Sequence, residues 1–237
     1  MQRELEVCAE TLQACEAANA GGADRIELCA ALSEGGVTAG VGFLREAIAA
    51  STIPVHALVR PRSGGFVYSA TEFRMACADA EMALSLGAAG IVVGMLTADG
   101  DVDVSQTAEL IRIANGRPVT FHRAFDLARD LYESLRMVID LGCSRVLTSG
   151  GQPTVMEGLE MLIELTEIAA GRIRIAAGGG VSLQNALLLA QVPGLDLHGS
   201  LRRKAKVEAV QDVLWQQMDA RVHVEDVLAM AAIVHGH

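Results

Sequence analysis

Short runs of apolar and β-branched residues alternate with longer segments of helical spacing along the chain. Eight runs have the length and composition of strands. They cover residues 5–8, 25–29, 55–60, 90–94, 119–123, 145–149, 174–178 and 195–199. Between them, segments such as 11–20, 71–86 and 156–170 repeat apolar residues at intervals of three and four. That spacing is typical of amphipathic helices.

Glycines follow several of these predicted helices and precede the next strand. They are Gly21, Gly22, Gly87, Gly116, Gly142 and Gly171. Glycine readily takes the positive φ with which many helices end. Eight strand and helix units predict an α/β fold, a single-domain (β/α)8 TIM barrel over residues 1–237. The alternative is an open parallel sheet, although the glycine-rich turn that marks nucleotide-binding sheets is missing after the first strand.

Composition excludes several classes of partner. The 29 acidic and 19 basic residues give a formal charge of -10, and only 3% of the chain is aromatic. Such a chain repels a phosphate backbone and has no platform for base stacking, so we expect no nucleic-acid partner. Apolar runs stop short of the roughly 20 residues that span a membrane, and the first residues lack the order of a secretion signal. We therefore expect a cytoplasmic protein with no membrane partner.

Alternation along the strands places many ionisable and sulfur-containing side chains inside the barrel. The predicted inward set is Glu4, Glu6, Cys8, Arg25, Glu27, Cys29, His56, Leu58, Arg60, Thr120, His122, Asp196, His198 and Ser200. Burying an ionised group without a partner is costly. The convergence of carboxylates, imidazoles and guanidiniums on one barrel mouth favours a site for acid and base chemistry. The alternative is an internal network that only closes the barrel.

Residues in the turns after the strands predict an anion site. Two arginines bracket the start of a glycine-rich turn after the third strand, and arginine binds carboxylates and phosphates bidentately. Glycine turns after the last three strands can offer backbone N–H groups to an anion, at the strands where barrels commonly bind phosphate. The candidate anion-binding residues are Arg60, Arg62, Ser149, Gly150, Gly178, Gly179, His198 and Ser200.

Five scattered cysteines do not form a disulfide framework in a reducing compartment. Cys8 and Cys29 end neighbouring strands, which lie about 4.8 Å apart, so that both sulfurs can reach one ion. Two thiolates suit Cu(I) better than zinc, which usually takes four ligands in structural sites. Alternatively, both cysteines are core side chains. Cys15, Cys77 and Cys143 are assigned no chemistry.

Seven segments together resemble the CutC family of copper homeostasis proteins. They read EVC at 6–8, GADRIELC at 22–29, SEGG at 33–36, IPV at 53–55, RPR at 60–62, TFHRAFD at 120–126 and RVLTSG at 145–150. The resemblance extends from residue 4 to about residue 200. It implies a cytoplasmic, homo-oligomeric barrel associated with copper tolerance, with Cu(I) ligands at Cys8 and Cys29.

The chain departs from this resemblance after the eighth strand. Relatives often carry a Ser-Ala pair there, whereas this chain has Ser200, Leu201, Arg202, Arg203 and Lys204. We interpret the basic run as a solvated loop. The alternative is that it adds positive charge beside the anion site.

Three functions fit these patterns. The first is a Cu(I)-binding protein that uses Cys8 and Cys29. The second is a barrel enzyme for a small phosphorylated or carboxylated compound. In it, Glu27 or His122 is the general base, and Arg123 and Asp126 orient the reacting group or stabilise developing charge. The third is a binding module in which the internal charges are structural.

Overall fold

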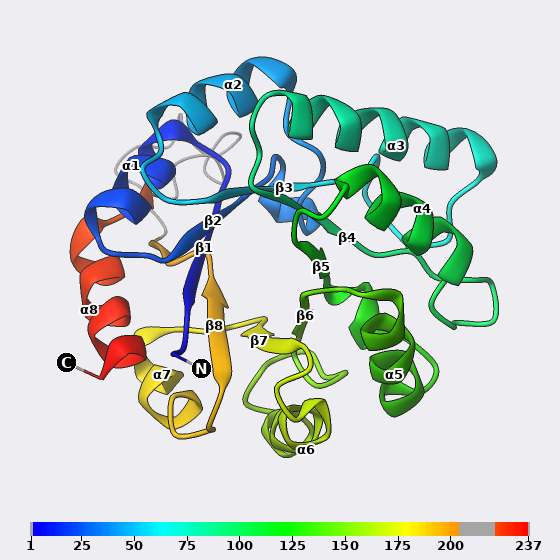
Figure 1. Cartoon of the computed structure of the whole chain (residues 1–237). Coiled ribbons are helices and arrows are strands. Elements are labelled where there is room, and N and C mark those ends of the chain that lie inside the picture. The colour runs from blue at the N-terminus through cyan, green and yellow to red at the C-terminus, as the bar shows by residue number, and fades with distance from the viewer. Residues whose placement is uncertain (1, 204–220, 237) are drawn as a thin grey trace, which may run out of the picture.

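A computed structural model describes residues 2–203 and 221–236 and shows a closed barrel of eight parallel strands with helices outside it (Figure 1). The strands are β1 (Leu5–Ala9), β2 (Arg25–Leu28), β3 (Val55–Leu58), β4 (Gly90–Val93), β5 (Val119–Phe121), β6 (Arg145–Thr148), β7 (Arg174–Gly178) and β8 (Leu195–Gly199). Pairing of β8 with β1 closes the ring. The predicted (β/α)8 barrel is therefore confirmed, and the open sheet is excluded.

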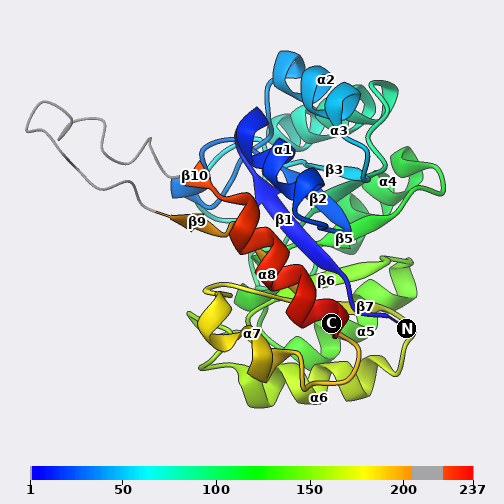
Figure 2. The ribbon, with the colours of Figure 1, turned by 90° about the vertical axis from the view of Figure 1, so that its left-hand side faces the viewer.

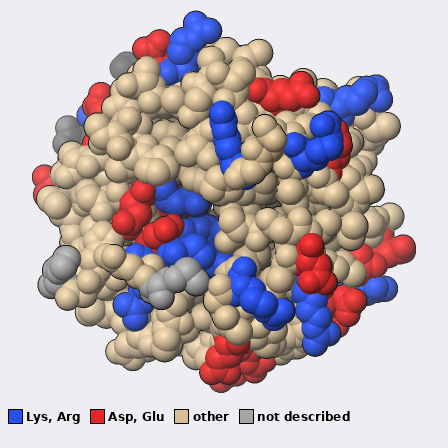
Figure 3. All heavy atoms as spheres, viewed as in Figure 1, with Lys and Arg blue, Asp and Glu red and all other residues tan. Residues whose placement is uncertain are grey.

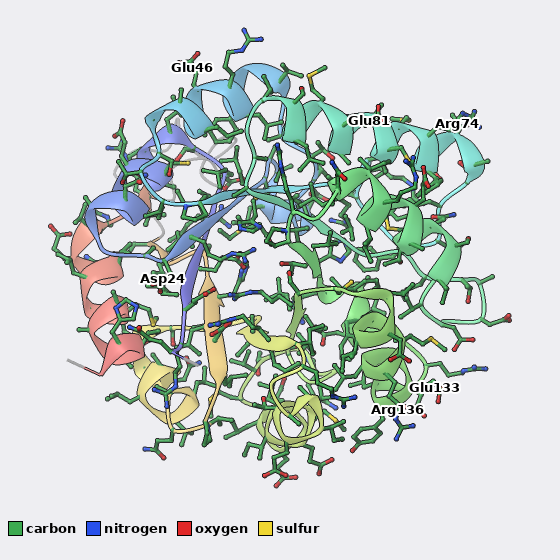
Figure 4. All side chains as sticks on the ribbon, in the orientation of Figure 1. Asp24, Glu46, Arg74, Glu81, Glu133 and Arg136 are labelled. Atoms are coloured by element: carbon green, nitrogen blue, oxygen red, sulfur yellow. The ribbon has the colours of Figure 1, made fainter. Side chains whose placement is uncertain are left out.

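The helices of the barrel lie between successive strands. They are α1 (Leu12–Ala20), α2 (Val41–Ala50), α3 (Ala70–Ser85), α4 (Val104–Ala114), α5 (Leu131–Leu141), α6 (Leu159–Ala169) and α7 (Leu183–Leu189), with the 3-10 segments η1 (Leu32–Glu34) and η2 (Arg123–Leu127). Helices α1, α3 and α6 match the predicted segments to within three residues. Charged residues of the outer helices, such as Glu46 of α2 and Arg136 of α5, point away from the barrel (Figure 4).

Local sequence explains where these helices begin and end. The Thr11 side chain accepts a hydrogen bond from the Ala14 amide and caps the start of α1. Gly142 ends α5 with a φ of 92°, a conformation that costs glycine little. Gly21 ends α1 where a Cβ would lie 2.3 Å from Val227. Glycine at this position therefore lets the last helix pack closely against the barrel.

The chain after β8 forms a pair of short strands that the sequence did not predict, followed by the eighth helix that a (β/α)8 barrel implies. Strand β9 (Arg202–Arg203) pairs with β10 (Arg221–Val222) at the end of the barrel where the parallel strands end, opposite the N-terminus (Figure 2). Helix α8 (Val224–His235) follows and packs against α1 and α7. Arg202 pairs with Glu10, and Arg203 lies 2.5 Å from Asp226.

The loop interpretation is thus wrong for Arg202 and Arg203, because each is in a strand and has a carboxylate partner, whereas Arg203 is exposed to solvent as expected. Lys204 lies outside the described residues. No helix in the described ranges is long and apolar enough to cross a membrane.

A group of charged residues fills the end of the barrel at which the strands begin. We call Glu4, Arg145, Arg174 and Asp196 the lower cluster. Asp196 lies 2.6 Å from Arg174 and 3.0 Å from Arg145, which also pairs with Glu4. Figure 3 views this end and shows basic and acidic side chains meeting in a hollow at its centre. The lower cluster lies at the opposite end of the barrel from the mouth.

Candidate functional site

A cavity of about 330 Å³ opens at the mouth of the barrel, where the parallel strands end. We call it the mouth cavity. Its charged and polar lining comes from Cys8, Glu27, Arg60, His122, Arg123, His198 and Ser200, and its remaining lining from Leu32, Gly35, Leu58, Phe66, Leu147, Gly179, Gly180, Val181 and Gly199. Its volume is within the range of pockets for small molecules.

Glu27 is a buried carboxylate in this lining that forms no ion pair with a described residue, although His198 lies within 4.8 Å of it. Its Oε2 atom has no hydrogen-bond partner in the same part of the chain. The Cys8 thiol donates to Oε1 at 3.4 Å. Burial raises the pKa of the Glu27 carboxyl; the charge of His198 opposes this rise and that of Glu6 adds to it. A pKa raised in this direction favours a carboxyl that takes up and releases a proton.

His198 and Glu6 form an ion pair beneath Glu27. His198 Nδ1 lies 2.7 Å from Glu6 Oε1, and Arg25 lies 2.5 Å from the same carboxylate. Burial would lower the pKa of His198, but the charges of Glu27 and Glu6 and the bond to Glu6 raise it. Burial would raise the pKa of Glu6, but Arg25 and His198 hold it well below its usual range. This layer is therefore an ionised network.

The two cysteines predicted as metal ligands lie together, but only one reaches the cavity. Cys8 Sγ and Cys29 Sγ are 3.5 Å apart. Cys29 is fully buried and is not part of the cavity lining. The hydrogen bond with Cys29 and burial raise the pKa of the Cys8 thiol well above its usual value. Cys8 Sγ, a Glu27 oxygen and a His198 nitrogen lie within 4.8 Å of one another, so these side chains also form a possible metal-binding group.

His122 is a neutral imidazole in a fixed orientation. Its Nδ1 accepts a hydrogen bond from the Ala124 amide at 3.1 Å, which places the ring proton on Nε2. Nε2 is buried and has no partner among the described residues. Burial and the charge of Arg60 lower the pKa of His122 to about 3. An imidazole in this state is a hydrogen-bond donor and a poor base.

His56 lies in β3 at the level of Glu27, and its ring lies against Gly90, where a Cβ would be 2.5 Å from Nδ1. Burial and the charge of Arg25 lower the pKa of His56 to about 3. It is not one of the residues that line the mouth cavity.

Arg60 lines the cavity, but both of its terminal nitrogens already donate to the protein itself. Its Nη1 donates to the carbonyls of Glu34 and Gly36, and its Nη2 donates to the carbonyl of Gly64. The guanidinium also stacks on the ring of Phe66, 5.0 Å from its centre. Arg60 therefore gives the cavity positive charge while it holds the loops of the mouth together.

Four of the residues predicted to bind an anion do not line the mouth cavity. They are Arg62, Ser149, Gly150 and Gly178. Arg62 pairs with Glu72 at the surface. Gly150 donates its amide to Thr148, and a Cβ on Gly178 would lie 2.4 Å from Leu147. These residues support the walls of the mouth, whereas Gly179, His198 and Ser200 of the same set line it.

Arg123 and Asp126 form a fixed pair at the end of β5. Asp126 accepts hydrogen bonds from Thr148 and from the amides of Ser149 and Gly151. Its other oxygen accepts from Arg123 Nε at 2.7 Å. Asp126 does not line the cavity, so it acts on the site by positioning Arg123, which does.

Sequence reasoning missed the apolar part of the site and the basic part of the lower cluster. Phe66 packs against both Arg60 and His122, with ring centres of Phe66 and His122 5.0 Å apart. It follows the glycine-rich turn after β3, where alternation gives no signal. Arg145 begins a predicted strand, and alternation applied to β6 would have placed it inside with Leu147.

Comparison with known proteins agrees with the predicted resemblance. A model of the CutC family matches residues 3–203. The CutC family protein of Chromobacterium violaceum is 47% identical over 203 residues, 85% of this chain and 82% of the relative. That of Bacteroides thetaiotaomicron is 42% identical over 225 residues, 94% and 90% of the two chains.

A solved structure supports the same relationship. The Streptococcus agalactiae protein assigned as copper homeostasis protein CutC has a TM-score of 0.79 and 32% identity, covering 84% of this chain and 99% of that one. Sequence and structure agree over the same region, and the chain therefore belongs to the CutC family.

Proposed function

We propose that this protein binds a small anionic compound in the mouth cavity and moves a proton on it, with Glu27 as the general base and acid. The observation that carries the proposal is the Glu27 carboxyl, which is buried in the cavity lining, forms no ion pair with a described residue and has one oxygen without a hydrogen-bond partner. A buried carboxyl with no ion-pair partner is costly to keep, and burial raises its pKa, which is the direction that favours a general base and acid.

His122 has a different role in this proposal from that of a base. Its Nε2–H donates, and its pKa of about 3 keeps the ring neutral throughout the physiological range. A neutral imidazole donor polarises a carbonyl oxygen without giving up its proton. Glu27 is thus preferred over His122 as the base, and a substrate with a hydrogen on the carbon beside a carbonyl suits the pair.

A screen of small phosphorylated and carboxylated compounds by thermal unfolding tests this function. At least one compound raises the melting temperature of the wild-type protein, because a ligand that binds only the folded state stabilises it. Glu27→Gln changes that shift, because Glu27 lines the cavity, and Arg62→Met, which changes an arginine outside the cavity, leaves it unchanged. If no compound raises the melting temperature, or if both variants respond as the wild type does, the proposal is wrong.

Cu(I) binding is the second candidate, favoured by the distance of 3.5 Å between the sulfurs of Cys8 and Cys29. The solved relative from Streptococcus agalactiae is described as a copper homeostasis protein, which agrees with copper as cargo. Thiolate is a ligand type that Cu(I) accepts, so the pair of Cys8 and Cys29 fits the ion, and the His198 imidazole within 4.8 Å of Cys8 Sγ offers a further ligand of an accepted type. Binding would release the thiol proton, because the raised pKa of Cys8 keeps it protonated in the free protein.

Competition with a Cu(I) chelator separates this candidate from the first. Cys8→Ser and Cys29→Ser each lose copper to the chelator at lower concentration than the wild type does. Cys143→Ser is the matched control, since Cys143 is another buried cysteine distant from this pair. Equal copper retention by all four proteins would remove the candidate. A cytoplasmic location and a homo-oligomeric state stay predictions from the sequence.

A further inference from the structure

The wall of the mouth cavity formed by the ends of β5, β7 and β8 presents hydrogen-bond donors that no described residue uses. Arg123 comes from the end of β5, Gly179 and Gly180 follow β7, and Ser200 follows β8. All four line the mouth cavity. Among residues 2–203 and 221–236, no acceptor is bonded to Arg123 Nη1, the amides of Gly179 and Gly180, or the Ser200 hydroxyl.

Arg123 is held in place by two of its three nitrogens. Nε donates to Asp126 at 2.7 Å, and Nη2 donates to the Ser149 hydroxyl at 2.7 Å. Ser149 is fully buried, and its amide donates to Asp126 as well. A guanidinium anchored in this way loses little conformational entropy when its remaining N–H groups bind a ligand.

The glycine turn after β7 is also fixed, with its amides left free. The Gly179 carbonyl accepts from the Val155 amide at 2.8 Å, and the Gly180 carbonyl accepts from Asn185 at 2.9 Å. Both glycines have positive φ, 115° and 81°. A Cβ on Gly179 would lie 3.0 Å from Arg123 Nη1, so glycine here lets the guanidinium lie directly against the turn.

We propose that this wall, formed by Arg123, Gly179, Gly180 and Ser200, is a subsite for a phosphate group of the ligand. The donors come from a guanidinium, two successive amides and a hydroxyl on three different strands. A phosphate monoester has three terminal oxygens that can accept from several directions, whereas a carboxylate has two oxygens in one plane. Free backbone amides together with a fixed cation are a common way to bind phosphate. The inference deepens the proposed function, on which it rests, by naming a phosphorylated substrate.

The position of this subsite gives the two sides of the mouth cavity different roles. The arginines predicted from the sequence to bind an anion were Arg60 and Arg62. Arg60 has its Nη1 and Nη2 bonded to carbonyls, and Arg62 lies outside the cavity. Arg123 therefore has the anion-binding role that the sequence predicts for Arg60 and Arg62, and Asp126 positions Arg123. The phosphate then holds one end of the substrate, which leaves the other end for Glu27 and His122.

Titration with inorganic phosphate, followed by ¹H–¹⁵N NMR, tests the subsite. In the wild-type protein, phosphate shifts the amide signals of Gly179 and Gly180, and acetate at equal concentration shifts them much less. Arg123→Met weakens phosphate binding about tenfold or more, because a hydrogen bond to a charged partner is lost. Arg62→Met is the matched control and binds phosphate as the wild type does. Unshifted glycine amides, or equal affinity in the Arg123→Met protein, would overturn the proposal.

Two more conservative variants test the subsite if Arg123→Met does not fold. Arg123→Lys keeps the charge and loses the anchoring by Asp126 and Ser149, so it binds phosphate more weakly than the wild type. Ser200→Ala removes one donor and weakens binding less. Wild-type affinity in both variants contradicts the subsite.

Glu27→Gln separates failure of the subsite from failure of the proposed function. This variant retains phosphate binding if the subsite is correct, because it removes a negative charge from the cavity. If phosphate does not bind at the glycine turn but a compound still needs Glu27 for its thermal shift, only the subsite is wrong. If phosphate binds at the turn and no organic compound depends on Glu27, the subsite stands and the proton-transfer function is wrong.

Discussion

The lower cluster and the mouth cavity are two charged regions inside one barrel, and they differ in how their charges are paired. Asp196 of the lower cluster is fully buried and lies within 3.0 Å of two arginines. Glu27 at the mouth is almost as buried, yet it has no arginine, lysine or histidine at ion-pair distance in the described part of the chain. Internal charge therefore does not mark a site by itself. A buried charged group that has no ion-pair partner is costly to keep, and it is therefore the more specific sign of a functional site.

The largest effect is expected from Asp196→Asn, which keeps the side-chain size and removes the charge that Arg145 and Arg174 share. Arg145 is 1% exposed and would be left with Glu4 as its ion-pair partner. Removing one member of a buried ion pair costs about 3–5 kcal/mol, and we expect a loss of this size in urea unfolding. Glu109→Gln, which breaks an exposed pair with Arg112, is the control and should change the free energy of unfolding much less. A loss of unfolding free energy smaller than that of the control would show that the lower cluster does not stabilise the fold.

The next effect is a pH dependence caused by His122. Its pKa is about 3 in the folded protein and about 6.5 in an unfolded chain. Below pH 6.5 the unfolded state binds a proton that the folded state does not, so stability is complete above this pH and falls towards pH 3. His122→Asn can still accept the Ala124 hydrogen bond and does not titrate.

The free energy of unfolding measured between pH 3.5 and 7 should therefore fall less steeply in His122→Asn than in the wild type. His56 has a similarly lowered pKa and makes the same kind of contribution, so part of the slope persists. Identical slopes in the two proteins would mean that the imidazole of His122 is protonated at its usual pH in the folded state.

Glu27→Gln, like Asp196→Asn, replaces a buried carboxylate by the amide of the same size. Its effect on the free energy of unfolding should be much smaller. The substitution removes a charge that has no ion-pair partner among the described residues and keeps the volume, so stability at pH 7 should change by less than about 1.5 kcal/mol. Because the pKa of Glu27 is raised on folding, the wild type loses stability as the pH rises above about 4.3, and the variant lacks this contribution. Urea unfolding at several pH values measures both. A loss as large as that of Asp196→Asn would make Glu27 a structural residue.

Arg62→Met is expected to have the smallest effect. Its ion pair with Glu72 is partly exposed, and such pairs contribute about 0–1 kcal/mol. Thermal unfolding should show a small change in melting temperature and the wild-type response to ligands. A lost ligand response would place Arg62 in the site after all.

The strands and the inward residues could be predicted from the sequence because both depend on local alternation. Glu6, Glu27 and His198 lie inside the barrel as the alternation indicates. Eight strand and helix units imply a helix after the eighth strand, but the bounds of α8 were not predicted, since its position depends on packing against α1 and α7. The local pattern of residues 224–235 does not predict those contacts.

The functional part of the site was harder to predict, because it depends on which donors are already used. Arg60, Arg62 and Arg123 look alike in the sequence. Their roles differ because Arg60 binds carbonyls of Glu34, Gly36 and Gly64, Arg62 binds Glu72, and Arg123 is anchored by Ser149, 26 residues further along the chain. Such partners become visible only when the fold brings the strand ends together.

Hydrogen exchange on a bound compound tests the central claim most directly. A phosphorylated or carboxylated compound that stabilises the protein is incubated with it in deuterated water and followed by ¹H NMR. The wild-type protein should replace a carbon-bound hydrogen of the compound with deuterium, and Glu27→Gln should do so at least about a hundredfold more slowly. Equal exchange in both proteins, or none in the wild type with any compound that binds, would contradict the claim that Glu27 is kept unpaired at the mouth to move a proton.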